Sequence, residues 1–165
     1  MTKAMEKYSN ISTHKRLGYV RGYLALGLVN EATLELEKVE VGDREAIEVR
    51  AVRVELHVAA KQWELVLEIA QPLCEVSPEN EGVWIAWASA LRKLQRVKEA
   101  EDVLLKAESF HGAKSAVLYY NLACYACLQG FHEEAEKHLT KACKMDERFE
   151  GQSLSEPDLQ GMMPF

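Results

Sequence analysis

The residues with the clearest potential for chemistry are Cys124 and Cys127, which form a Cys-x-x-Cys pair. This spacing is used by zinc sites and by thiol redox centres. A structural zinc site needs four ligands, commonly from two such pairs, and the remaining cysteines, Cys74 and Cys143, form no second pair. A thioredoxin-like redox pair lies where a strand turns into a helix, whereas this pair lies within a helical pattern. We therefore expect buried thiols, and a thiol or metal-binding protein that uses Cys124 and Cys127 is the alternative.

The histidines and the known catalytic motifs give no further site. The five histidines share no metal-ligand spacing, and they are His14, His57, His111, His132 and His138. The sequence contains no HExxH zinc motif, no GxSxG nucleophile motif and no glycine-rich phosphate loop. We therefore expect no catalytic residue, no metal and no cofactor, and predict that the protein is not an enzyme.

The composition is that of an ordinary globular protein, with 48% hydrophobic and 28% charged residues. The 26 acidic residues outnumber the 20 basic ones, which disfavours a nucleic-acid partner because phosphate binding needs a concentrated positive field. No apolar run approaches the ~18 residues that a membrane span needs, and the N-terminal stretch lacks the apolar centre of a signal peptide. These features predict a cytoplasmic protein without a nucleic-acid or membrane partner.

The cysteine pair lies in residues 116–149, which predict two helices joined by a tight turn. Leu118 and Leu122 recur at helical spacing, Gly130 interrupts the pattern, and Ala135 begins a second apolar stripe. Neither helix can bury its apolar face alone. Such a pair needs similar pairs stacked on it, so the rest of the chain should repeat the same pattern.

The pattern does repeat, with a period of 34 or 35 residues. The positions equivalent to the small residue of the second helix are Ala32, Val66, Ala100 and Ala135. The same tiling places Gly27 and Gly130 at one turn position. The four repeating units are 13–46, 47–80, 81–114 and 115–149.

This period and its marker residues resemble the tetratricopeptide repeat (TPR), a unit of ~34 residues with Trp, Leu-Gly, Tyr, Ala, Phe, Ala and Pro at fixed places. Trp84 matches the opening Trp, Tyr23 the later Tyr, and Pro78 the closing Pro. Unit 47–80 is the weakest match. The resemblance covers about nine-tenths of the chain.

The resemblance implies an all-α fold, a right-handed superhelical solenoid of four helix-turn-helix repeats that forms a single domain over residues 1–149. Residues 150–165 are expected to form a C-terminal tail or a short capping helix. Residues 155–158 carry a helix-start signature, and Leu159 and Met162 are the expected docking residues. Three roles stay open for this segment: it caps the stack, occupies the groove or is disordered.

In TPR proteins the first helix of each pair lines an inner groove that binds an extended or helical peptide. Carried over by position, the groove residues of this chain are Leu17, Arg21, Leu24, Val52, Glu55, Ile85, Ser89, Arg92, Lys93, Tyr120, Asn121 and Cys124. Chaperone-binding relatives hold a partner's terminal carboxylate with a clamp of lysines and asparagines. Only Asn121 matches a position of that clamp, which disfavours a binder of heat-shock chaperone tails.

The predicted groove is largely apolar, with positive charge at Arg21, Arg92 and Lys93. Such a groove suits an apolar segment that carries a few acidic residues. The chain's own tail is a segment of this kind, with Asp158 followed by apolar residues that include Met163. We therefore expect the groove to bind a partner peptide, and the tail to compete for it.

The resemblance thus implies a non-catalytic protein-protein interaction module that acts as a scaffold or in a chaperone-like role. Acidic TPR chaperones of type III secretion share this architecture, although no motif of the sequence is diagnostic of them. The oligomeric state is open between a monomer and a weak homodimer. The sequence identifies neither the partner nor the pathway.

Overall fold

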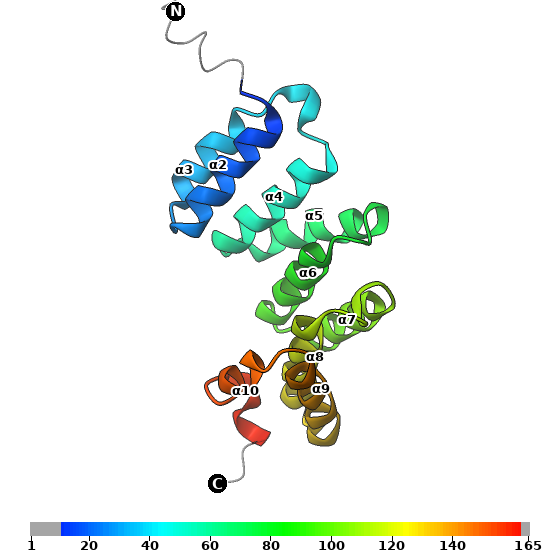
Figure 1. The fold of residues 1–165 in the computed structure, drawn as a ribbon. Coiled ribbons are helices and arrows are strands. Elements are labelled where there is room, and N and C mark those ends of the chain that lie inside the picture. Colours follow the sequence, from blue (N-terminus) through cyan, green and yellow to red (C-terminus); the bar gives the residue numbers. More distant parts are fainter. Residues whose placement is uncertain (1–10, 163–165) are drawn as a thin grey trace, which may run out of the picture. The chain divides into compact units, whose positions relative to one another are not determined.

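The computed structural model describes residues 11–162, and every regular element in this range is helical (Figure 1). The all-α prediction is confirmed. No helix among these residues is both long and apolar enough to cross a membrane. The chain separates into two compact units, Met1–Ile69 and Ala70–Phe165. The single domain over 1–149 stays a prediction, and Met163 lies outside the described residues.

The first unit is built from two helical pairs. Its elements are α2 (Thr13–Ala25), α3 (Val29–Glu37), the short 3-10 helix η1 (Val41–Asp43), α4 (Ile47–Ala59) and the first part of α5 (Trp63–Val76). The side chain of Ser12 caps α2 by accepting a hydrogen bond from the backbone N–H of Lys15 at 3.4 Å.

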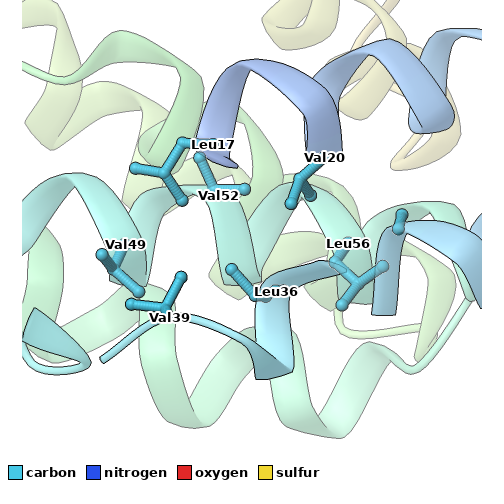
Figure 2. Close-up of a cluster of buried hydrophobic side chains, with 8 residues drawn as sticks. Leu17, Val20, Leu36, Val39, Val49, Val52 and Leu56 are labelled. Atoms are coloured by element: carbon cyan, nitrogen blue, oxygen red, sulfur yellow. The ribbon is translucent and has the colours of Figure 1, made fainter. Parts of the chain in front are cut away.

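The core of the first unit joins α2, α3, the loop after α3, and α4. Figure 2 shows this cluster, which consists of Leu17, Val20, Ala32, Leu36, Val39, Val49, Val52 and Leu56. Each fully buried valine or leucine side chain stabilises the fold by ~1.5–3 kcal/mol relative to an exposed one. A buried ion pair lies beside this core, because Arg16 Nη1 contacts Glu35 Oε1 at 2.8 Å and Lys38 Nζ contacts Oε2 at 2.7 Å.

The second unit holds the remaining helical pairs and the C-terminal segment. Its elements are the end of α5, α6 (Glu81–Lys93), α7 (Val97–His111), α8 (Ala116–Leu128), α9 (His132–Met145), α10 (Arg148–Ser153) and the 3-10 helix η2 (Pro157–Met162). The helix-start signature at residues 155–158 is followed by η2, which begins at Pro157. The side chain of Ser115 caps α8 by accepting a hydrogen bond from Leu118 N at 3.0 Å.

The turn between the helices of each pair has one conformation throughout. The residues with positive φ are Gly27 (72°), Lys61 (56°), Gln95 (63°) and Gly130 (82°). The residue after each of them donates a backbone hydrogen bond of 2.9 Å to the carbonyl five positions earlier, as Phe131 does to Ala126. This is the Schellman ending of a helix, which needs one left-handed residue. The turn position predicted from Gly27 and Gly130 therefore has this physical basis.

A polar network joins α7, α8 and α9 in the second unit. The hydroxyl of Tyr119 donates a hydrogen bond to Glu108 Oε1 at 2.6 Å, and Lys141 Nζ donates one to the same hydroxyl. A Cβ added to Gly112 would stand 2.7 Å from the backbone oxygen and the Cγ of Glu108, and 2.8 Å from the hydroxyl of Tyr119. The close approach at this turn thus requires a glycine.

Candidate functional site

The second unit contains a cavity of about 170 Å³ between α6, α8 and the C-terminal segment. Its lining residues are Ser89, Arg92, Lys93, Tyr120, Asn121, Cys124, Tyr125, Glu156 and Asp158. Six of the predicted groove residues therefore meet in one place, three of them on α6 and three on α8. We call this cavity the α6–α8 site.

Helical spacing explains why these side chains share a wall. Ser89, Arg92 and Lys93 are three and four residues apart on α6, so they lie on one face of the helix. Tyr120 and Cys124 have the four-residue spacing on α8. The sequence alone shows which residues share a face of α6 and which share a face of α8. Only the packing of the second unit brings these two faces to the same cavity.

Arg92 is the charged centre of the α6–α8 site. Its Nε donates a hydrogen bond to Asp158 Oδ2 at 2.8 Å, and its Nη2 donates a second one to Oδ1. The two side chains are 25% and 11% exposed. The hydrogen bond with Asp158 is the largest cause that raises the pKa of the Arg92 guanidinium above its ordinary value. A bidentate pair that is largely removed from water holds its geometry more firmly than an exposed pair.

The C-terminal segment also covers the apolar part of α8. Leu159, the residue after Asp158, is only 1% exposed, and η2 packs directly on α8. The buried Phe149 of α10 lies against Tyr120, with the ring centroids 4.7 Å apart. The face of α8 that was predicted to line a groove is therefore covered by residues of the same chain.

Cys124 and Cys127 are free, buried thiols. Burial, with smaller contributions from the carboxylates of Glu156 and Asp158, raises the pKa of Cys124 to about 12. Burial also raises the pKa of Cys127. Because the thiolate is the nucleophile and the metal ligand, these surroundings disfavour the thiol or metal alternative. Among the described residues, no three His, Cys, Asp or Glu side chains are grouped so that they could hold a metal ion.

The first unit places its predicted groove residues differently. Leu17 and Val52 are not surface residues, because both belong to the buried core of this unit (Figure 2). Leu24 is partly buried against the same core. Arg21 and Glu55 lie at the surface, where Arg21 Nη2 contacts Glu55 Oε1 at 2.8 Å and Nε donates to both carboxylate oxygens. The positive charge expected at Arg21 is therefore matched by a neighbouring carboxylate.

Sequence reasoning missed three residues that complete the α6–α8 site or its cover, namely Tyr125, Glu156 and Phe149. Half-buried Ile85, which was predicted, does not line this cavity. One signal in the sequence pointed to the cover. The helix AVLYYNLACYACL is apolar on all sides, and nine of its residues are buried in the structure. A helix that is apolar all round needs neighbours all round, so α8 required a further covering element.

No protein-family model and no curated protein sequence matches the chain. Solved structures do match it. MamA MSR-1 is 26% identical, with a TM-score of 0.67, over 84% of this chain and 79% of that one. TTC0263, a thermophilic TPR protein of Thermus thermophilus, is 18% identical, with a TM-score of 0.74, over 92% and 86%. YrrB, a TPR protein with an unusual peptide-binding site, is 13% identical, with a TM-score of 0.66, over 97% and 87%.

Proposed function

Because the chain is a tetratricopeptide-repeat protein in its fold, we propose that it is a non-catalytic interaction module that holds a partner peptide or helix against α6 and α8. The observation that carries this proposal is the bidentate pair between Arg92 and Asp158. A surface that holds one acidic, apolar segment of polypeptide has the chemistry to hold another. YrrB shows that this fold presents a peptide-binding site in one protein.

The charge and the apolar surface of the α6–α8 site indicate which side chains the partner segment should carry. Arg92 and Lys93 supply positive charge, which favours a carboxylate in the partner. Tyr120 and the α8 surface beside it supply aromatic and apolar area, which favours a leucine-like or aromatic side chain. We therefore propose a partner segment in which an acidic residue lies next to a large apolar one.

Other features of the proposed role are predictions. They are a scaffold or chaperone-like role, a cytoplasmic location, a monomer or weak homodimer, and a contribution of Arg21, Leu24 and Glu55 to binding. In the first unit a charged partner residue would have to exchange with the pair of Arg21 and Glu55. Because that ion pair is exposed, breaking it costs little free energy.

The proposal is tested with peptides selected from a displayed random library against the full-length chain. Each selected peptide carries a photo-crosslinking residue, and the protein residues that it labels are identified by mass spectrometry. We expect enrichment of Asp or Glu next to Leu, Met or Phe, with labels on α6 and α8. As a matched control, replacing the peptide's acidic residue by Lys should weaken binding about tenfold or more, because a charge-assisted hydrogen bond contributes ~1.5–3 kcal/mol. Labels confined to α7 and α9 would refute the proposal.

A further inference from the structure

The last described residues, 154–162, place Glu156 and Asp158 in the lining of the α6–α8 site. We propose that this segment, which we call the clasp, is a built-in competitor for the site, and that a partner carrying an acidic residue followed by leucine replaces it. This inference rests on the proposed function, since it names the chemistry of the partner and the way in which access to the same site is regulated.

The clasp complements the α6–α8 site in charge. Two carboxylates, Glu156 and Asp158, line the cavity opposite the cations Arg92 and Lys93. The chain as a whole carries a net charge of -6, so a local concentration of positive side chains distinguishes this cavity from an average acidic surface. Asp158 engages Arg92 through two hydrogen bonds, which makes the clasp a specific occupant of the site.

The clasp also has a buried apolar residue, Leu159, directly after the acidic Asp158. Leu159 is 1% exposed, whereas Leu154 at the start of the clasp is 70% exposed. The adjacent pair of Asp158 and Leu159 therefore carries the attachment. A peptide with the same two neighbouring side chains would reproduce both contacts.

A partner peptide can replace the clasp readily because the clasp has little stable secondary structure of its own. It consists of a short turn followed by the 3-10 helix η2, which spans only Pro157–Met162. A 3-10 helix has poor hydrogen-bond geometry and is not stable alone at this length, so the position of the clasp depends on its two side-chain anchors. A tethered segment competes at an effective concentration of roughly millimolar, which lowers the apparent affinity of a free peptide without any new contact.

The test uses the full-length chain and a synthetic peptide of the clasp sequence, LSEPDLQGM, as the probe. The variant that releases the clasp is D158N/L159A, and D158N alone provides a milder second variant that keeps the leucine anchor. We expect the probe to bind D158N/L159A at least tenfold more tightly than it binds the wild type, with D158N in between. The same peptide with Asn in place of its Asp is the negative control.

Adding R92Q in each background gives a signature specific to competition. In D158N/L159A the substitution removes a contact of the probe alone, so the affinity should fall about tenfold. In the wild type the clasp and the probe lose the same contact, so the apparent affinity should change little. R96Q is the matched control, because Arg96 is also bidentate to a carboxylate, Glu99, but lies on the exposed surface near the start of α7.

A second readout does not require peptide binding. Cys124 faces the clasp in the cavity, so releasing the clasp should raise the rate of its alkylation at least tenfold, with Cys74 of α5 as the internal reference. Equal labelling of Cys124 in wild type and D158N/L159A, with equal probe affinity, would overturn the inference. Faster labelling without probe binding, while library peptides still crosslink to α6 and α8, would also overturn it and leave the proposed function intact. A wild-type dimer that D158N/L159A dissociates would assign the clasp to a second copy and overturn the intramolecular form.

Discussion

The turn between the two helices of a repeat should be more stable with glycine than with any other residue at its left-handed position. Removing the glycine from one repeat should therefore lower the free energy of unfolding, and introducing a glycine into another repeat should raise it. Gly130 and Gln95 occupy equivalent turns and both have positive φ, 82° and 63°. A residue with a Cβ in this conformation is destabilised by roughly 1–2 kcal/mol, and the greater flexibility of glycine in the unfolded chain offsets ~0.4–1 kcal/mol of that difference. We therefore expect Gly130→Ala to lower the free energy of unfolding by about 1 kcal/mol and Gln95→Gly to raise it by up to about 1 kcal/mol.

The structure separates this backbone effect from crowding. No atom lies within 4 Å of a Cβ placed on Gly130, so the expected loss in Gly130→Ala comes from φ alone. Gly22 is the matched control, since it also has open space around it but lies inside α2 without a positive φ. Gly22→Ala should stabilise the protein by ~0.5–1 kcal/mol, because alanine favours a helix more than glycine does.

Urea unfolding followed by circular dichroism measures all three variants. The transition should be fitted for each compact unit where two steps appear, since Gly22 lies in the first unit and the two turn residues lie in the second. If Gly130→Ala stabilised the protein as much as Gly22→Ala, the assignment of a left-handed turn to the repeat would be refuted.

Three further predictions concern other features of the molecule. Gly112→Ala should lower the free energy of unfolding by ~1–3 kcal/mol in urea titrations, because its Cβ would lie 2.7 Å from the backbone oxygen of Glu108 and 2.8 Å from the hydroxyl of Tyr119. A double-mutant cycle on the exposed pair of Arg21 and Glu55 should give a coupling energy of only ~0.2–1 kcal/mol. The pKa of the Cys124 thiol is about 12 in the folded protein, against an ordinary value of 9.0 that applies in the unfolded chain. The protonated thiol therefore contributes its full stabilisation below pH 9, and this contribution is lost as the pH rises toward 12. Between about pH 8 and about pH 10, the stability of the wild type should therefore fall more than that of Cys124→Ala, and equal slopes would contradict this reasoning.

The sequence by itself determined the helical repeat. The period of 34 or 35 residues, the apolar stripes and the break at Gly130 are local properties, because helix formation and helix ending depend on neighbours within a few positions. The residues of α6 that share a face, such as Ser89 and Arg92, could be named for the same reason. The turns at Lys61 and Gln95 carry no glycine, so the residue type does not reveal their left-handed conformation, although the repeat period places them at the same turn position as Gly27 and Gly130.

Only the tertiary structure decided which helix faces are free and which are covered. Leu17 and Val52 were expected in a groove and lie in the core, because the sequence shows that a side chain is apolar but not which neighbour buries it. The pair of Arg92 and Asp158 joins residues 66 positions apart, and no local pattern predicts such a contact. Its formation depends on where α10 and η2 pack against α8, which is a property of the folded unit as a whole.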